Sequence, residues 1–340
     1  MGTLRAQAGG VHVAVLALSV LFACGARVPV SPADAGAGPY DDAGVVTSAP
    51  DAGRGDAGTA PGLDAGTPDA GYQPDPVLAE RPYQLVVPVG ASPSTALPLV
   101  VLLHGFAETA SLLDTWFGMS DEAQARTFLL ALPEGTRNAT GQQFWNATDG
   151  CCAAGVDVDD VAYLSSVIED VKARHRVDGR RVYLVGHSNG GFMAHRLACE
   201  RADLVTGIVS FAGATWDDAS RCTPSRPVSV LQVHGTLDAV VLYLGGRTVM
   251  GSASYPSAED TVRTWAVKNG CTGTQLQRLT GDLDLALDVL LDETTREAFT
   301  GCPQDGAVEL WSIFGGSHFP LLSGDFATLT FNWLEAHARP

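Results

Sequence analysis

The stretch "YLVGHSNGGFMAHRLA" (residues 183–198) changes character at a single serine. It begins as an apolar run typical of a buried strand, and it ends with apolar residues at helical spacing. Between the two, Gly186, Ser188 and Gly190 match the pattern G-x-S-x-G, in which a serine occupies a sharp turn from a strand to a helix. Small flanking residues are needed because the backbone is strained there. The stretch predicts a strand–turn–helix corner that carries Ser188, and a glycine-rich turn that only caps a helix is the alternative.

Strand-like and helix-like segments alternate around this corner. Strand-like runs lie at 83–89, 98–105, 127–133, 181–186, 207–213, 228–235 and 307–316. Helical patterns lie at 159–175, 190–202, 257–270 and 324–337. The central strands are apolar on both faces, as expected for a parallel sheet that helices cover on both sides. The order predicts a doubly wound α/β architecture, whose functional groups gather in loops beyond the carboxyl ends of the strands.

Two residues downstream of the corner are candidates to activate its serine. A serine hydroxyl becomes a nucleophile when an imidazole takes its proton and a carboxylate orients that imidazole. On this kind of sheet the three groups follow the chain order serine, acid, histidine. Asp238 follows the strand-like run 228–235, and His318 follows the run 307–316. The order predicts Ser188, Asp238 and His318 as a catalytic triad.

Other residues near the strand ends receive supporting roles. The backbone N–H groups of Phe106 and Asn189 are expected to bind a developing oxyanion, because they occupy the loop after an early strand and the position after the nucleophile. The Phe106 side chain is then free to line a pocket for substrate. His187 is expected to point away from the serine, and His234 to pack beneath the loop of Asp238.

The first 76 residues do not resemble a folded core. Residues 1–24 combine Arg5, a short apolar run and a small-residue exit, as in a secretory signal. Their end, "LFAC", resembles a lipobox, which would make Cys24 a lipid-attachment site; plain secretion is the alternative. Residues 25–76 contain "DAG" six times among prolines, which favours a solvated acidic tether over a calcium site because the spacing is irregular. An exported protein is expected, either extracellular or anchored to the cell envelope.

Charge restricts the partners of the remaining domain, residues 77–340. Of the formal net charge of −17, +1 lies in residues 1–24 and −6 in residues 25–76, which leaves −12 for this domain. An acidic domain without a basic stripe argues against nucleic acid and against anionic lipid as partners. Membrane contact is therefore expected only through the N-terminal lipid, and the oligomeric state stays open.

Six cysteines remain when Cys24 is set aside. They are Cys151, Cys152, Cys199, Cys222, Cys271 and Cys302. An even number in an exported protein predicts disulfides. The preferred pairs are 199 with 222 and 271 with 302, since each closes a local loop; the adjacent cysteines 151 and 152 are either bridged or free thiols. A metal site is not expected, because no C-x-x-C or paired histidine pattern supports it.

Several stretches extend the pattern beyond the triad. They are "LVVLLHGFAETA", "PEGTRNATGQQFWNATDGCCA", "VDDVAYLSSVIEDV", "RVYLVGHSNGGFMAHRLACERAD", "VLQVHGTLDAVV" and "ELWSIFGGSH". Together they span nearly all of residues 80–340 in order, and they resemble the secreted α/β-hydrolase esterases that include polyhydroxybutyrate depolymerases and feruloyl esterases. The resemblance implies the α/β-hydrolase fold and a carboxylic ester hydrolase that uses Ser188, Asp238 and His318 without a metal or organic cofactor.

The resemblance leaves the substrate open. Hydroxyalkanoate oligomers or polyesters and feruloyl-type esters are both implied. After His318 the chain reads Phe319-Pro320 where many relatives have Thr-Trp-Pro, which weakens any transfer of substrate preference. Trp145 either contacts substrate or packs its own loop. Two other functions stay in view, namely a non-catalytic surface-displayed binding protein and a serine peptidase of the same fold.

Overall fold

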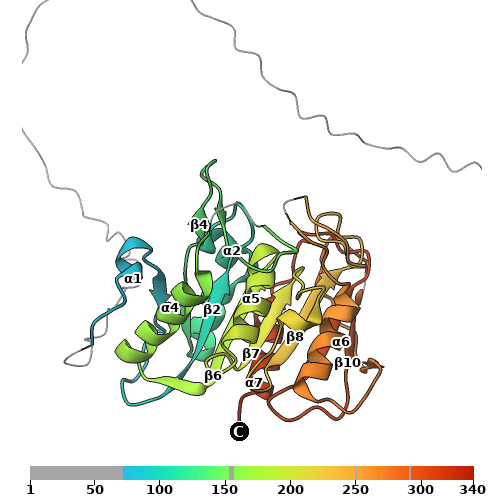
Figure 1. The fold of residues 1–340 in the computed structure, drawn as a ribbon. Helices are drawn as coiled ribbons and strands as arrows, with labels where there is room; N and C mark the ends of the chain where they lie inside the picture. The colour runs from blue at the N-terminus through green and yellow to red at the C-terminus, as the bar shows by residue number, and fades with distance from the viewer. Residues whose placement is uncertain (1–71, 153–156, 250, 291) are drawn as a thin grey trace, which may run out of the picture. The chain divides into compact units, whose positions relative to one another are not determined.

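Strand β6 (Val177–His187), which leads into the serine corner, lies inside a nine-stranded sheet (Figure 1). The computed structural model describes residues 72–152, 157–249, 251–290 and 292–340. The strands in sheet order are β1 (Gln84–Val86), β3 (Leu129–Leu132), β2 (Leu97–Leu103), β6, β7 (Gly207–Phe211), β8 (Ser229–Gly235), β11 (Val308–Ile313), β10 (Thr294–Ala298) and β9 (Gln277–Arg278). Pairing is parallel from β3 to β11 and antiparallel at both edges. The predicted, mostly parallel sheet is confirmed.

Helices cover both faces of this sheet. Side chains along a buried strand alternate between the two faces, so each strand contributes to two separate core clusters. Leu99 and Val101 of β2 join the core cluster that includes α4 (Asp160–Arg174), α5 (Asn189–Glu200) and α6 (Ala258–Asn269). Val100 and Leu102 join the opposite cluster, with α2 (Ala110–Phe117), α3 (Met119–Arg126) and α7 (Phe326–Ala336). The remaining elements are α1 (Val77–Glu80), the hairpin of β4 (Thr136–Arg137) with β5 (Gln143–Phe144), and a 3₁₀ turn at Ala219–Arg221.

All seven predicted strands and all four predicted helices are present. The structure adds α2 and α3, and it adds β10 and β9 at one edge of the sheet. Helix α3 reads "MSDEAQAR" and β10 reads "TTREA". Neither contains an apolar run, since a surface helix and an edge strand need little apolar surface, and the search for apolar periodicity does not detect them.

The predicted leader (residues 1–24, with Cys24) and the predicted tether up to residue 71 lie outside the described residues. The chain divides into two units, Met1–Ala57 and Gly58–Pro340, and every described residue belongs to the second. Within the described part of the chain, no helix is both long enough and apolar enough to cross a bilayer.

Three disulfides form in the described domain. Cys199 at the end of α5 pairs with Cys222 after the 3₁₀ turn, and Cys271 after α6 pairs with Cys302. These are the preferred pairs. The adjacent residues Cys151 and Cys152 are bridged rather than free.

The approach of α5 to the sheet depends on glycines. A Cβ on Gly190 would lie 1.9 Å from the carbonyl oxygen of Leu103 at the end of β2, and a Cβ on Gly186 would lie 2.3 Å from the carbonyl oxygen of Gly190. Both contacts are with backbone, which cannot move aside as a side chain can. The two glycines of G-x-S-x-G are therefore required by packing, and they bring the ends of β2 and β6 next to the start of α5.

We predict that Gly190→Ala destabilises the domain by about 3 kcal/mol or more, because the added methyl group forces β2 and α5 apart. Gly179→Ala, within β6, is the control, since a Cβ there meets no atom within 4 Å; its effect should stay within about 0.5 kcal/mol. Urea unfolding with the disulfides intact measures both variants. Equal stability of the two variants would contradict the packing argument.

Candidate active site

Ser188 occupies the corner between β6 and α5. Its backbone has φ 50° and ψ −118°, a conformation that non-glycine residues rarely adopt. The Ser188 N–H donates to the carbonyl oxygen of Phe211 on β7 (2.8 Å), which anchors the corner to the next strand. The residue is 8% exposed, at the carboxyl end of the sheet. A strained, anchored serine at this position has the geometry of a nucleophile elbow.

Asp238 and His318 form a direct hydrogen bond from neighbouring strand ends. His318 Nδ1 donates to Asp238 Oδ2 at 2.6 Å. The other carboxylate oxygen, Oδ1, accepts from the N–H groups of Val240 (2.8 Å) and Val241 (2.9 Å). The loops that carry the pair approach closely at Gly235, where a Cβ would lie 2.3 Å from the carbonyl oxygen of Gly316.

Burial and hydrogen bonding set the ionisation of this pair. Burial raises the pKa of Asp238, but the hydrogen bonds from His234 and His318 outweigh it, so the pKa lies below its ordinary value. Burial lowers the pKa of His318, and the bond to Asp238 only partly reverses this effect. The pair therefore consists of a carboxylate and a neutral imidazole near pH 7, which is the combination that a general base requires.

The serine corner contacts the loop of His318 through the residue before Ser188. Its neighbour His187 packs its ring on the ring of His318, with 4.7 Å between centroids, and His187 Nε2 lies 3.2 Å from the carbonyl oxygen of His318. The fold thus brings together the three loops that carry the predicted triad. His187, expected only to point away from the serine, connects two of them.

Two backbone N–H groups lie where an oxyanion site is expected. Asn189 is the first residue of α5, and Phe106 lies three residues after Leu103, the last residue of β2. Within the described residues, neither the Phe106 nor the Asn189 N–H donates a hydrogen bond. The close approach at Gly190 holds these two segments next to one another.

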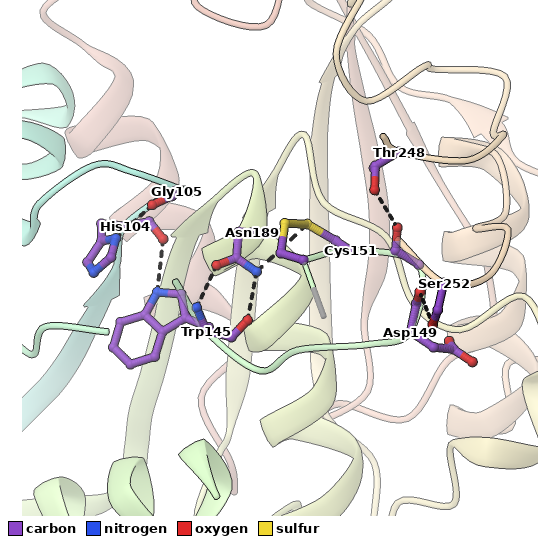
Figure 2. The surroundings of a disulfide bond; sticks show 10 residues. His104, Gly105, Trp145, Asp149, Cys151, Asn189, Thr248 and Ser252 are labelled. Atoms are coloured by element: carbon purple, nitrogen blue, oxygen red, sulfur yellow. Dashed lines mark hydrogen bonds between the residues drawn. A yellow bond between two sulfur atoms is a disulfide. The ribbon is translucent and has the colours of Figure 1, made fainter. Parts of the chain in front are cut away.

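Trp145 forms hydrogen bonds with both of these segments. Its indole N–H donates to the carbonyl oxygen of His104 (2.9 Å), and its backbone N–H and carbonyl oxygen both bond to the Asn189 side chain (Figure 2). The Asn189 amide also contacts Cys151 of the adjacent-cysteine bridge at 3.7 Å. The Trp145 ring is completely buried, which favours the packing alternative, and its contact with substrate stays a prediction. Phe106 is half-buried at the edge of the core.

A chain of buried hydrogen bonds begins far from the serine, on α6 and α5. Trp265 Nε1–H donates to His195 Nδ1 (2.9 Å), so His195 carries its proton on Nε2, which bonds to the Gln232 side-chain oxygen (3.1 Å). The Gln232 amide nitrogen donates to the carbonyl oxygen of Gly213 (2.8 Å), which fixes the orientation of the amide. Burial lowers the pKa of His195 to about 4.

The same chain continues to the predicted acid. The Gln232 amide nitrogen lies 3.3 Å from His234 Nδ1, which leaves the proton of His234 on Nε2. That N–H donates to the carbonyl oxygen of Val241 (2.8 Å) and lies 3.4 Å from Asp238 Oδ2. His234 packs beneath the acid loop as expected, and it also orients the carboxylate, a role that the sequence does not reveal.

These elements define the α/β-hydrolase fold: a mostly parallel sheet, a strained serine corner, and an acid and a histidine at later strand ends. The acetyl xylan esterase from Aspergillus awamori has a similar fold, with a TM-score of 0.53 at 13% identity over 75% of this chain and 93% of that one. The residues that the structure describes contain no group of three or more histidine, cysteine or carboxylate side chains placed to hold a metal ion.

Sequence comparison supports the family resemblance. The family model "Esterase PHB depolymerase" matches residues 81–242. Feruloyl esterase B of Piromyces equi is 30% identical over 240 residues, 68% of this chain and 41% of that protein. The putative esterase NocK of Nocardia uniformis is 32% identical over 46% of this chain and 45% of that protein. Feruloyl esterase C of Emericella nidulans is 26% identical over 62% of this chain and 72% of that protein.

The chain therefore resembles the polyhydroxybutyrate depolymerase and feruloyl esterase group, as its motifs predict. It spans less than half the length of the first two of these relatives.

We predict a pH-dependent effect of His195→Gln on stability. The pKa of His195 is about 4 in the folded protein and about 6.5 in the unfolded chain, so the unfolded chain binds the extra proton between these values and folding weakens as the pH falls. The loss of stability caused by the substitution should thus be about 2 kcal/mol smaller at pH 4.5 than at pH 7.5. Urea unfolding at both pH values measures it, and a pH-independent difference would contradict the neutral assignment.

Proposed function

We propose that this chain is an exported serine esterase that hydrolyses carboxylic esters through an acyl-enzyme. The observation that carries the proposal is the 2.6 Å hydrogen bond between His318 and Asp238, formed beside the strained serine corner at Ser188. The family resemblance points to the same chemistry. Export is supported by the three disulfides, which are typical of oxidising compartments, and by the leader predicted from the sequence.

The proposed reaction follows from this geometry. Ser188 Oγ attacks the ester carbonyl while His318 takes its proton, and the resulting oxyanion accepts hydrogen bonds from the N–H groups of Phe106 and Asn189. His318 then gives the proton to the departing alcohol, which leaves an acyl group on Ser188. Water attacks this acyl group by the same sequence, releasing the acid and restoring the serine. Asp238 stays ionised throughout and stabilises the imidazolium of His318.

Apolar side chains beside the triad support an ester with an apolar acyl or alcohol group. Leu237 and Val240 flank Asp238, and Phe319 follows His318; all three are more than half exposed. Exposed apolar residues grouped by the chain next to a catalytic pair favour contact with an apolar ligand. Feruloyl-type esters and hydroxyalkanoate oligomers both meet this condition, and both belong to the proposal.

We predict that Ser188→Ala lowers the hydrolysis of p-nitrophenyl butyrate by at least about 10⁴-fold, since the acyl-enzyme cannot form. Ser210→Ala is the matched control, because Ser210 is a fully buried serine on the adjacent strand β7. The control should keep its rate, and circular dichroism should show both variants folded. Equal rates for the wild type and Ser188→Ala would favour the binding-protein alternative.

A substrate panel tests the reaction class. We expect hydrolysis of methyl ferulate or of a 3-hydroxybutyrate oligomer, and no measurable release from a peptide anilide, because the exposed side chains next to the proposed acid and histidine, Leu237, Val240 and Phe319, are apolar. The assay measures the released acid by chromatography. Cleavage of the anilide at a rate similar to that of the esters would instead support the peptidase alternative.

A further inference from the structure

A histidine–carboxylate pair that takes no part in the proposed reaction lies next to the serine corner, with the histidine buried and the carboxylate partly buried. His187 is completely buried, and its Nδ1 lies 3.1 Å from Glu108 Oε1. The opposite ring nitrogen, Nε2, lies 3.2 Å from the carbonyl oxygen of His318. The second oxygen of Glu108, Oε2, accepts from the Gly105 N–H at 2.9 Å. The pair thus touches three loops of the site.

The partners of His187 determine its protons. A carboxylate and a backbone carbonyl can only accept hydrogen bonds, whereas a neutral imidazole has one N–H to donate. Both contacts of His187 are hydrogen bonds only when both ring nitrogens carry a proton, which makes the ring an imidazolium. Burial raises the pKa of Glu108, but the bonds from His187 and Gly105 outweigh it and leave the pKa below its ordinary value, so the carboxylate is ionised.

The other buried histidines differ in this respect. His104 Nε2 accepts from the Gly135 N–H (2.9 Å), and His195 Nδ1 accepts from Trp265 (2.9 Å). A nitrogen that accepts a hydrogen bond carries no proton, so both rings are neutral. Of these three rings, His187 is the one whose two nitrogens both face hydrogen-bond acceptors.

Aromatic rings enclose His187 on its remaining sides. The centroids of Trp116 and Phe319 lie 4.9 and 4.8 Å from the centroid of His187, and those of Phe211 and Phe117 lie 5.8 and 6.5 Å away. Aromatic rings exclude water and attract a cation. This environment shields the charge of His187 from solvent and strengthens its attraction to Glu108.

We propose that His187 and Glu108 form a lasting imidazolium–carboxylate pair that positions the loops of Phe106, Ser188 and His318 and disfavours protonation of His318. His187 is a positioning residue here, since it acts through His318. The effect on ester hydrolysis rests on the proposed function. The charge of His187 does not depend on that function.

The charged and titratable groups around the two histidines define the expected pH dependence. Among the described residues, His187 faces the titratable groups Glu108 and His318, and aromatic rings pack around it. His318 faces Asp238 and His187, with His234 behind Asp238. The positive charge of His187 lowers the pKa of His318, while Asp238 raises it. Removing the charge of His187 should therefore raise the pKa of His318.

Nuclear magnetic resonance of protein labelled with ¹⁵N-histidine tests the charge directly. The His187 ring is identified by the signals that disappear in His187→Gln. We expect both of its nitrogens to resonate as protonated nitrogens at pH 7, while His195 shows one protonated and one unprotonated nitrogen. An unprotonated nitrogen on His187 at pH 7 would overturn the proposal, whether or not the protein hydrolyses esters.

The pH profile of kcat/KM for p-nitrophenyl butyrate tests the consequence. Glu108→Gln removes the carboxylate charge and keeps an oxygen acceptor, so His187 loses its counter-charge and becomes neutral. The midpoint of the acidic limb should shift to higher pH by about half a unit or more. Glu122→Gln is the control, because Glu122 is a buried carboxylate on α3 that pairs with Arg126 (3.3 Å); its limb should stay in place.

The outcomes separate the two proposals. An acidic limb that stays in place in Glu108→Gln would overturn the proposed effect on His318. Absence of ester hydrolysis in the wild type would overturn the proposed function. The charge of His187 would then be decided by the resonance experiment alone. If Glu108→Gln does not fold, the resonance experiment on the wild type still decides the charge.

Discussion

The contact between Gly190 and the end of β2 is the constraint on which the site depends. Because Gly190 has no Cβ, the start of α5 lies against the carbonyl oxygen of Leu103. The N–H groups of Phe106 and Asn189 are held in adjacent segments by this contact. A second close approach, at Gly235, places the acid loop against the histidine loop at Gly316. Two contacts that only glycine permits thus assemble residues from four strand ends.

Buried polar groups support the proposed triad from two directions, and the two supports differ in charge. On the acid side, a chain of hydrogen bonds between uncharged side chains runs from Trp265 through His195 and Gln232 to His234, which lies next to Asp238. On the serine side, His187 and Glu108 form the proposed charged pair. The neutral chain leaves the negative charge of Asp238 available to His318, whereas the charged pair opposes protonation of His318. Together they favour a carboxylate beside a neutral base, which is the resting state that nucleophile activation requires.

Much of the fold can be predicted from the sequence, because buried parallel strands are long apolar runs and the serine corner has its own glycine pattern. Chain order alone selects Ser188, Asp238 and His318, and the structure brings the last two into contact. The contacts of Trp145 and His187 cannot be predicted from sequence patterns or chain order. The indole of Trp145 bonds to His104, 41 residues away, and His187 contacts His318, 131 residues away. Such contacts depend on side-chain direction after folding, which neither periodicity nor local spacing encodes.

The central claim is that Ser188 is a nucleophile activated by His318 and Asp238. Its most direct test is covalent labelling with a fluorophosphonate, followed by mass spectrometry of the digested protein. The account predicts one adduct per chain, on the peptide that contains Ser188, formed far more slowly in Asp238→Asn because His318 then loses its carboxylate partner. An unlabelled Ser188 in folded protein, or an adduct on a different residue, would contradict it.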